Sequence, residues 1–355
     1  MRNKKNTHRV LITGNEAMGE ASVRAGCRFY AGYPITPQNE LIGYMSKRMP
    51  QVGGVFIQAE SELAAINMVF GASCTGTRSM TSSSSPGISL KQEGISYLAA
   101  CQLPCLIINV SRGGPGLGNI ASSQSDYFQS TRGGGHGDYR IIVLSPSSVQ
   151  EAVDLVFLGF DLADKYRIPC MILTEAILGQ MMEPVSFPDF IDVKSVSRNK
   201  DWILDGAKSR KKRIICSLFL EEGVLERHNL VLQQKYKEIS NTESRAYTYK
   251  TEDAHYLITG FGIQARICRE AVDILRDRGI KVGLFRPITL WPFPYQELQK
   301  ISSNIKRVLV VEQNYGQMLE DIKLGLPHKE VHFLGRGGGG VPTVLEIIEK
   351  MDKII

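Results

Sequence analysis

The 355-residue chain has no uninterrupted apolar stretch long enough to cross a membrane. A spanning helix needs about 18 apolar residues or more, and the best candidate, Tyr97 to Val110, is interrupted by Gln102 and Pro104. The basic N-terminal residues precede only a short apolar run, Val10 to Ile12, which is too short for the core of a secretory signal peptide. We therefore predict a cytoplasmic protein that does not bind membranes.

Cysteine is present in seven copies, but never in the clustered spacing that holds a metal. There is no Cys-x-x-Cys pair, whereas an iron–sulfur cluster is usually held by about four thiolates and structural zinc by close ligand pairs. The cysteines are predicted to be reduced and mostly buried thiols.

An excess of one charge is also missing. Lys and Arg number 42 against 36 Asp and Glu, which gives a net charge of only +6. The densest basic run, residues 208–213, is not accompanied by a nucleic-acid-binding motif. We predict no nucleic-acid partner and interpret the run as a solvated linker or as a docking patch for an acidic partner.

The sequence does contain a repeated pattern of short apolar runs and amphipathic stretches. This pattern predicts an α/β protein with a parallel sheet covered by helices on both faces. It stops near residue 182, where prolines and charges replace it, and resumes near residue 253. The predicted strands are 10–13, 53–58, 78–81, 106–110, 141–144, 169–173, 256–259, 281–285 and 307–311, and the predicted helices are 15–25, 61–73, 89–100, 149–165, 221–240, 264–278 and 295–302.

Two glycine motifs have the spacing of nucleotide-binding loops without their partner residues. The motif from Gly14 to Glu20 lacks the Lys and the Ser or Thr that contact phosphate and Mg²⁺. Gly260-Phe-Gly262 has the right context, but the next predicted strand ends in Arg286-Pro287 instead of an acidic residue for a ribose. We predict tight strand–helix turns at both motifs; NAD(H) binding to the isolated chain would instead support a dinucleotide-binding protein.

Three polar side chains have sequence contexts typical of a ligand site. Arg112 ends a predicted buried strand, where a guanidinium is placed either to bind a carboxylate or to form a surface ion pair. Thr36 lies between Pro34 and Pro37 in a stiff loop, which suits substrate orientation and an ordinary turn alike. Glu62 begins a predicted helix, so it has either the usual helix-dipole role or a buried, proton-sharing one.

Two loops of small residues are further candidates. Residues 82–87 are four serines followed by Pro86 and Gly87. Such a loop either allows backbone N–H groups to approach a flat ligand closely or forms a flexible turn. The glycine-rich loop at residues 132–138 contains one histidine, His136. We give more weight to a role of His136 in loop structure than to a role in an active site.

Taken in order, these motifs resemble those of the 2-oxoacid:ferredoxin oxidoreductases. The resemblance rests on YPITP, QAESE before AAINMVFGA, TSSSSPGISLKQEG, and NVSRGGPGLGN with QSDYFQ. The later segment ITGFGIQARICREAVDILRDRGIKVGLFRPITLWPFP resembles the transketolase C-terminal-type domain of that family. The chain is similar to the subunit that carries the pyrimidine-binding domain. Through GPGLGNI and TRGGGHGDY it is most similar to the enzymes that act on 3-methyl-2-oxobutanoate (2-ketoisovalerate).

The resemblance implies both a domain organisation and a set of site residues. Residues 1–181 would form the pyrimidine-binding thiamine diphosphate domain, residues 182–252 a connecting segment, and residues 253–355 a transketolase C-terminal-like domain. Glu62 would hydrogen-bond N1′ of the aminopyrimidine and Arg112 would hold the 2-oxoacid carboxylate. The remaining implied residues are Thr36 with Tyr33, Pro34 and Ile35 around the substrate, and Ser84, Ser85, Pro86 and Gly87 near the cofactor.

The resemblance also implies partners, because parts of the machinery are missing here. The family's Gly-Asp-Gly motif for the diphosphate and Mg²⁺ is absent, as are cysteines for [4Fe–4S] clusters. A diphosphate-binding (beta-type) subunit, a gamma-type subunit and a ferredoxin-like subunit would supply them. The hetero-oligomer would transfer electrons to an external ferredoxin and acyl groups to coenzyme A, with the active site between subunits.

The implied reaction is the oxidative decarboxylation of a branched-chain 2-oxoacid to acyl-CoA and CO₂. 2-Oxoglutarate has a second carboxylate, which is costly to bury without a cation. No Lys or Arg lies between Gly113 and Thr131, which favours an apolar side chain unless Arg132 or a partner supplies the cation. Turnover of 2-oxoglutarate and a non-catalytic scaffold of the same fold are the alternatives; full activity of a Glu62→Gln complex would support the scaffold.

Overall fold

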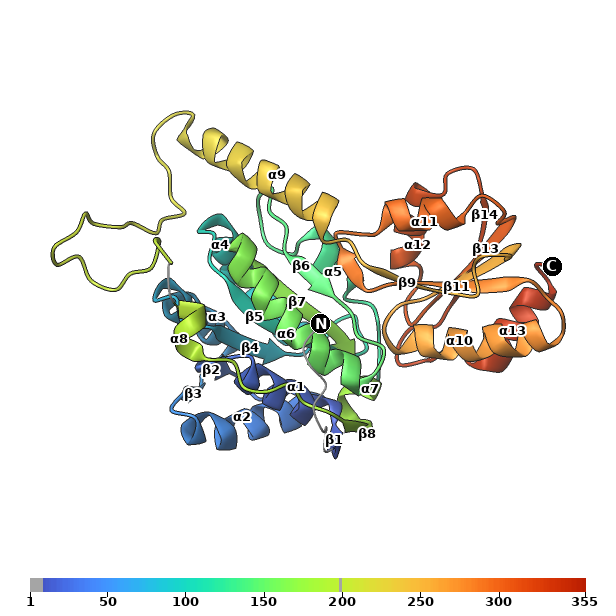
Figure 1. The fold of residues 1–355 in the computed structure, drawn as a ribbon, viewed down its shortest axis with the longest axis horizontal. Helices are drawn as coiled ribbons and strands as arrows, with labels where there is room; N and C mark the ends of the chain where they lie inside the picture. Colours follow the sequence, from blue (N-terminus) through green and yellow to red (C-terminus); the bar gives the residue numbers. More distant parts are fainter. Residues whose placement is uncertain (1–8, 198–199) are drawn as a thin grey trace.

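The computed structural model describes residues 9–197 and 200–355, and these residues form two α/β units and a short two-stranded sheet (Figure 1). The larger sheet has seven strands in the order β12-β6-β7-β5-β4-β2-β3. Neighbouring strands are parallel except for β12, which is antiparallel to β6. Their bounds are β2 (Phe29–Gly32), β3 (Val55–Gln58), β4 (Ser79–Ser83), β5 (Cys105–Ser111), β6 (Ile142–Leu144), β7 (Pro169–Glu175) and β12 (Thr289–Trp291).

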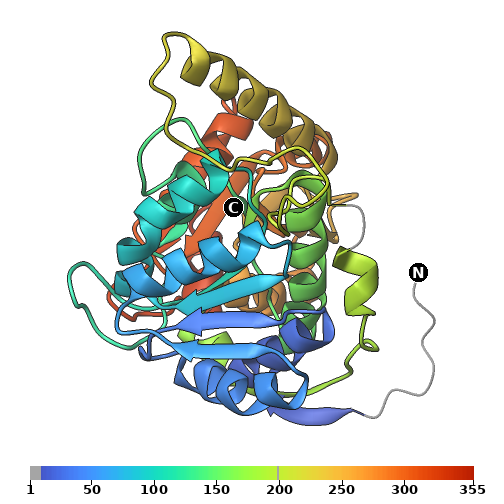
Figure 2. The ribbon, with the colours of Figure 1, turned by 90° about the vertical axis from the view of Figure 1, so that its left-hand side faces the viewer.

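Helices cover both faces of this sheet, as the alternating pattern predicted (Figure 2). One group consists of α1 (Gly14–Arg24), α2 (Asn39–Gln51) and α6 (Val149–Tyr166), which pack against one another. The other consists of α3 (Glu62–Cys74) and α4 (Ser85–Ala100). The central strands β5 and β7 are buried along their whole length because both of their faces are covered.

Short elements lie at the margins of the large sheet. The strands β1 (Val10–Thr13) and β8 (Met182–Val185) pair with each other in antiparallel fashion. The helices α5 (Tyr127–Arg132), α7 (Ala176–Gln180) and α8 (Val193–Ser197) have five or six residues each. None of the described helices is long and apolar enough to cross a membrane.

Residues 200–222 form neither helix nor strand. The segment is anchored at its start, where the N–H of Leu204 donates to the carbonyl oxygen of Cys74 (2.8 Å), and then forms a loop that projects from the body of the protein (Figure 1). The basic run at 208–213 lies in this loop, where Arg210 and Arg213 pair with Asp205. The chain returns in α9 (Val224–Thr242), whose His228 Nε2 lies 2.7 Å from the carbonyl oxygen of Ala100. One helix was predicted in this segment, and α9 confirms it within a few residues.

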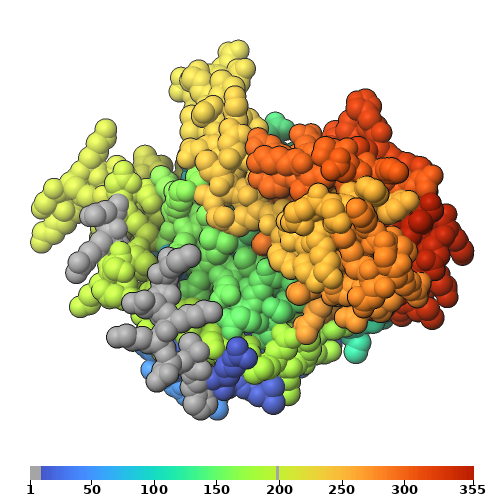
Figure 3. Space-filling view, turned by 45° about the vertical axis from the view of Figure 1, so that its right-hand side comes forward, coloured from blue at the N-terminus to red at the C-terminus, as the bar shows by residue number. Residues whose placement is uncertain are grey.

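The second unit has a five-stranded sheet in the order β14-β13-β10-β11-β9, and it forms a lobe beside the first (Figure 3). The strands β10 (Tyr256–Thr259), β11 (Val282–Pro287), β13 (Arg307–Glu312) and β14 (Glu330–Gly335) run parallel, while β9 (Ala246–Tyr249) is antiparallel to β11. Its helices are α10 (Gly262–Asp277), α11 (Tyr295–Ile301), α12 (Gln317–Gly325) and α13 (Val344–Asp352).

Two strands belong to a different sheet from the one that the sequence pattern suggested. The strand β9 comes from the segment predicted as a connection, yet it belongs to the second sheet. The strand β12 comes from the C-terminal part, yet it extends the first sheet. Both are short and lack a long apolar run, so periodicity could not distinguish them from loops.

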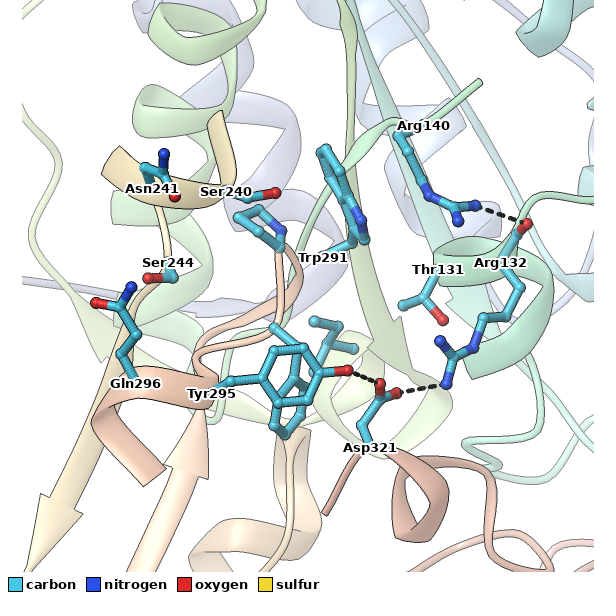
Figure 4. A pocket seen from close by; sticks show the side chains of 13 residues that line it. Thr131, Arg132, Arg140, Ser240, Asn241, Ser244, Trp291, Tyr295, Gln296 and Asp321 are labelled. Atoms are coloured by element: carbon cyan, nitrogen blue, oxygen red, sulfur yellow. Dashed lines mark hydrogen bonds and ion pairs between the residues drawn. The ribbon is translucent and has the colours of Figure 1, made fainter. Parts of the chain in front are cut away.

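The two units are held together by buried polar contacts around α12. The Asp321 carboxylate accepts hydrogen bonds from the Tyr127 hydroxyl (2.7 Å) and from Tyr295. It also forms an ion pair with Arg132 at 3.0 Å, and Figure 4 shows its contacts with Tyr295 and Arg132. Arg132, Tyr295 and Asp321 line a hollow of about 300 Å³. Asp321 therefore fixes Arg132 to the C-terminal unit.

A second contact between the units explains the glycine motif at residues 260–262. The Glu175 carboxylate, at the end of β7, accepts a hydrogen bond from the N–H of Ile263 at the start of α10 (3.2 Å). A Cβ at position 262 would lie 1.8 Å from Glu175 Oε1, and Gly262 has φ +55°. Glu175 therefore fills the helix N-terminus where a phosphate would bind, and the motif is a close-packed turn, as predicted.

We expect Glu175 to make the stability of the chain depend on pH. Burial raises the pKa of Glu175 to about 7, and that of Glu312 to about 7 as well. An unfolded Glu titrates near ~4.3, so unfolding releases protons between about pH 4.3 and 7, and stability falls as the pH rises through that window.

Urea unfolding of the wild type and of Glu175→Gln between pH 5 and 8 measures this effect. The Gln variant keeps the volume of the side chain but has no proton to lose. We expect its stability to fall less steeply with pH, whereas Glu60→Gln, at an exposed position, should follow the wild type. Equal slopes for wild type and Glu175→Gln would contradict the expectation.

Candidate active site

The predicted site residues lie at one edge of the seven-stranded sheet. The strands β5, β4, β2 and β3 are neighbours and run parallel, so their carboxyl ends meet at the same edge. The chain continues from these ends into the loop 33–37, the start of α3, the start of α4, and Arg112. Open α/β sheets bind ligands at this edge.

Arg112 connects two of these loops. Its Nη1 donates to the carbonyl oxygen of Thr36 (2.9 Å), and its Nη2 donates to the carbonyl oxygen of Leu117 (3.1 Å). Its Nε is buried and has no hydrogen-bond partner among the described residues. The structure thus brings Thr36 and Arg112 together and leaves one guanidinium donor unpaired.

The side chain of Thr36 is partly exposed beside this contact. Its hydroxyl accepts a hydrogen bond from Asn39 Nδ2 (3.0 Å). The preceding residues of the loop, Tyr33 and Pro34, are exposed, and Ile35 is partly buried. The loop therefore presents a hydroxyl and an apolar surface at the same place.

Gln38 anchors this loop to the sheet, a role that the sequence analysis did not identify. Gln38 is fully buried; its Nε2 donates to the carbonyl oxygen of Tyr33 (3.3 Å) and its Oε1 accepts from Ser82 Oγ (2.7 Å). Ser82 in turn shares a 2.7 Å hydrogen bond with the Tyr30 hydroxyl. The only signal in the sequence was its position directly after the YPITP motif.

Glu62 is buried at the first turn of α3, with only 5% of its surface exposed. Ser61 caps the helix by accepting a hydrogen bond from the N–H of Ala64 (3.1 Å). Gly87 approaches Glu62 closely: a Cβ at position 87 would lie 2.5 Å from Glu62 Oε1 and 2.0 Å from Ser83 Oγ. Only glycine permits this approach between the start of α4 and the carboxylate.

The start of α4 also connects Glu62 to Arg112. The helix begins at Ser85, four residues before its predicted start, because Pro86 fits the first helical turn. Ser85 Oγ accepts from the N–H of Arg112 (3.0 Å) and donates to Asp126 Oδ2 (2.7 Å). Ser85 therefore holds the main chain of Arg112.

Asp126 is a buried carboxyl group that the sequence analysis missed as a site residue, although it lies within the QSDYFQ motif. Burial raises its pKa, while hydrogen bonds from Ser85 and from Asn109 Nδ2 (2.9 Å) oppose the rise. Ser85 and Pro86 also line a hollow of about 480 Å³, with the glycines at 113–116 and with residues 314–317 of the second unit. This hollow gives access to the edge of the sheet beside Arg112.

His136 does not join this group. Its carbonyl oxygen accepts a hydrogen bond from Ser96 Oγ (2.8 Å), and its exposed ring lies edge-on to Tyr97 at 6.3 Å. It packs the glycine-rich loop against α4. Among residues 9–197 and 200–355, no group of three or more His, Cys, Asp or Glu side chains could hold a metal ion.

A parallel sheet of this topology, with a buried glutamate and an arginine at its carboxyl edge, is an α/β fold with a ligand site at that edge, and comparison with known families identifies its class. Residues 20–254 match the family model "Pyruvate flavodoxin/ferredoxin oxidoreductase, thiamine diP-bdg", and residues 254–347 match "Pyruvate:ferredoxin oxidoreductase core domain II". The chain belongs to the 2-oxoacid:ferredoxin oxidoreductase family, as its motifs predicted.

Within this family the chain is similar to individual subunits of known enzymes. It is 46% identical over 346 residues to the ketoisovalerate oxidoreductase subunit VorB of Methanothermobacter thermautotrophicus, covering 97% of each chain. It is 35% identical over 376 residues to the 2-oxoglutarate synthase subunit KorA of the same organism, covering 98% of this chain and all of that one.

Two solved structures have the same fold. The 2-oxoglutarate:ferredoxin oxidoreductase of Magnetococcus marinus, solved with 2-oxoglutarate, coenzyme A and succinyl-CoA bound, superposes with a TM-score of 0.88 at 26% identity. The match covers 98% of this chain but only 65% of that one. A split-gene transketolase, at 14% identity and a TM-score of 0.58, supports the fold alone, and with it the predicted transketolase-like architecture.

The residues present fit the aminopyrimidine half of thiamine diphosphate. Ser83 Oγ and Ser84 Oγ are buried polar atoms without a hydrogen-bond partner among the described residues. Gly87 keeps the backbone close to the Glu62 carboxylate, in a space that any larger residue would fill. A planar ring with nitrogen donors and acceptors is a suitable partner for such a set.

Proposed function

We propose that this chain provides the aminopyrimidine side of the active site in an enzyme that oxidatively decarboxylates branched-chain 2-oxoacids, with 3-methyl-2-oxobutanoate as the preferred substrate. The products are acyl-CoA, CO₂ and reduced ferredoxin. The observation that carries the proposal is the meeting of Glu62, Thr36 and Arg112 at one edge of the sheet, with Arg112 bonded to the Thr36 carbonyl. The 46% identity to a VorB subunit supports the choice of substrate.

Glu62 holds and releases a proton at N1′ of the aminopyrimidine in this proposal. Thiamine diphosphate, when bound, supplies the carbon nucleophile and the electron sink for decarboxylation. The buried position of Glu62 keeps water from competing for that proton. Ser84, Ser85, Pro86 and Gly87 form the wall beside the ring, and the close approach at Gly87 fixes the carboxylate.

Arg112 and Thr36 bind and orient the substrate. The unpaired Nε of Arg112 lies buried at the edge of the sheet, and a guanidinium N–H is a strong donor to a carboxylate. The Thr36 hydroxyl, in the loop that Tyr33, Pro34 and Ile35 begin, orients the keto oxygen. Ser85 holds the main chain of Arg112 by accepting a hydrogen bond from its N–H, and Asp126 in turn accepts a hydrogen bond from Ser85.

The side chain of the substrate is proposed to be apolar because the available cation is already paired. Arg132, which could have bound a second carboxylate, forms an ion pair with Asp321 at 3.0 Å. The loop after Arg112 presents Leu117 and Ile120, which are 82% and 62% exposed. A branched aliphatic group fits such a surface better than the distal carboxylate of 2-oxoglutarate does.

The missing machinery is assigned to other subunits. We propose that a beta-type subunit binds the diphosphate and Mg²⁺, that gamma-type and ferredoxin-like subunits complete the complex with [4Fe–4S] clusters, and that coenzyme A and an external ferredoxin are co-substrates. The complex would work in the cytoplasm. We propose that the chain is divided into domains at 1–181 and 253–355 with a connecting segment at 182–252. In this division β9, from the connecting segment, joins the sheet of the second domain, and β12, from the second domain, joins the sheet of the first.

Anaerobic turnover of the assembled complex tests the proposed function. The chain is co-purified with the subunits encoded beside it and supplied with thiamine diphosphate, Mg²⁺, coenzyme A and a viologen acceptor. We expect a higher kcat/KM for 3-methyl-2-oxobutanoate than for pyruvate or 2-oxoglutarate, and no turnover by this chain alone. Preference for 2-oxoglutarate would contradict the proposal that the side chain of the substrate is apolar. Absence of turnover with every 2-oxoacid would contradict the proposed reaction.

A further inference from the structure

Lys91 is a fully buried lysine on α4, one turn beyond Gly87. Its Nζ donates to the main-chain carbonyl oxygen of Glu62 at 3.3 Å. Among the described residues, no carboxylate lies within ion-pair distance of this amine. Lysine is almost never fully buried unless it is paired, so this position needs an explanation.

The packing of α4 against α3 traps the lysine beside Glu62. Gly87, Lys91 and Gly94 lie on one face of α4, at the i, i+4 and i+7 spacing of a helix. A Cβ at position 94 would lie 2.5 Å from Ile66 Cγ2, and a Cβ at position 87 would lie 2.5 Å from Glu62 Oε1. The two glycines bring the helices into close contact, and the Lys91 side chain fills the space between them.

We propose that Lys91 is a positioning residue for Glu62: its ε-amino group holds the first turn of α3 through the Glu62 carbonyl, and its positive charge attracts the Glu62 carboxylate. This inference rests on the proposed function, because it assumes that Glu62 contacts the aminopyrimidine.

The protonation of Lys91 is itself coupled to Glu62. Burial lowers the pKa of Lys91 to about 7, and the negative charge of Glu62 acts in the opposite direction. Glu62, on the facing helix α3, is the charged group that acts on the amine within the described part of the chain. The amine therefore changes charge near neutral pH, directly beside the first turn of α3.

Two substitutions separate the charge from the hydrogen bond. Lys91→Met keeps most of the volume of the side chain and removes both, whereas Lys91→Gln removes the charge and keeps an uncharged N–H donor on a side chain that is one bond shorter. Lys47→Met, at an exposed position on α2, is the matched control. Thermal unfolding checks the fold, and we expect Lys91→Met to be at least as stable as the wild type, because an apolar side chain replaces a buried amine.

The readouts are the pH profile of kcat/KM in the assembled complex and a pH titration of the circular-dichroism signal of bound thiamine diphosphate. Loss of the positive charge should move the acid limb and the spectroscopic midpoint upward by about one pH unit or more in both Lys91 variants. Lys47→Met should not move either. A Lys91→Gln complex with the wild-type profile and midpoint would overturn the inference.

The same experiment separates this inference from the proposed function. If Glu62→Gln abolishes most of the turnover while both Lys91 variants behave as the wild type, Lys91 is only structural and the proposed function stands. If Glu62→Gln keeps full turnover, the assignment of Glu62 fails, and the inference about Lys91 fails with it.

Discussion

Replacement of Glu62 by Gln is expected to lower the kcat of the assembled complex by about 10²- to 10⁴-fold, the range over which a positioned general acid or base acts. Gln keeps the size of the side chain and can still hydrogen-bond to N1′, but it cannot accept or release the proton. Steady-state turnover of 3-methyl-2-oxobutanoate, with the cofactor at saturation, measures the effect.

Glu60→Gln provides the matched control for this substitution. Glu60 lies two residues earlier and is exposed, so its replacement removes the same charge without reaching the buried site. We expect the Glu60→Gln complex to turn over at the wild-type rate and the Glu62→Gln complex to remain assembled, as judged by size-exclusion chromatography. Similar rates for both variants would contradict the role of Glu62.

Replacement of Arg112 by Lys is expected to raise the KM for the 2-oxoacid by about 10- to 100-fold, since a hydrogen bond to a charged group contributes about 1.5–3 kcal/mol. Lysine keeps the positive charge but loses the planar fork that contacts Thr36, Leu117 and the substrate at once. The substrate is then held by a single flexible charge. Initial rates over a wide range of 2-oxoacid concentrations separate KM from kcat.

The control for Arg112→Lys is the same substitution at Arg227, an exposed arginine on α9. It should leave KM unchanged. The KM for coenzyme A should also stay near the wild-type value in Arg112→Lys, because the guanidinium is proposed to bind the 2-oxoacid carboxylate only. A rise in both KM values, or in neither, would show that Arg112 does not act specifically on the 2-oxoacid.

The sequence predicted the parts of this fold whose signals are local. Long buried strands such as β5 and β7 and long helices such as α6 have apolar runs or periodic patterns that a single chain displays. The turn at Gly260 to Gly262 could also be predicted, because its missing acidic partner argued against a dinucleotide site. Its structural partner, Glu175, lies far away in the sequence and could not be identified.

The rest depended on contacts between distant segments. β12 has only three residues, and its place in the first sheet follows from pairing with β6, which no local pattern encodes. The motifs identified Glu62, Thr36 and Arg112 individually, but the contact of Arg112 with Thr36 joins residues 76 positions apart. Lys91 falls within the predicted helix 89–100, and only the packing of α4 on α3 reveals its burial beside Glu62.

The most direct test of the account is the rate at which the C2 proton of bound thiamine diphosphate exchanges with deuterium, measured by quenched-flow NMR in the assembled complex. We expect exchange to be slowed by about 10²- to 10⁴-fold in Glu62→Gln and to be unchanged in Glu60→Gln. Equal exchange rates in the wild type and in Glu62→Gln would mean that this chain does not supply the proton-transfer group, and would contradict the central claim.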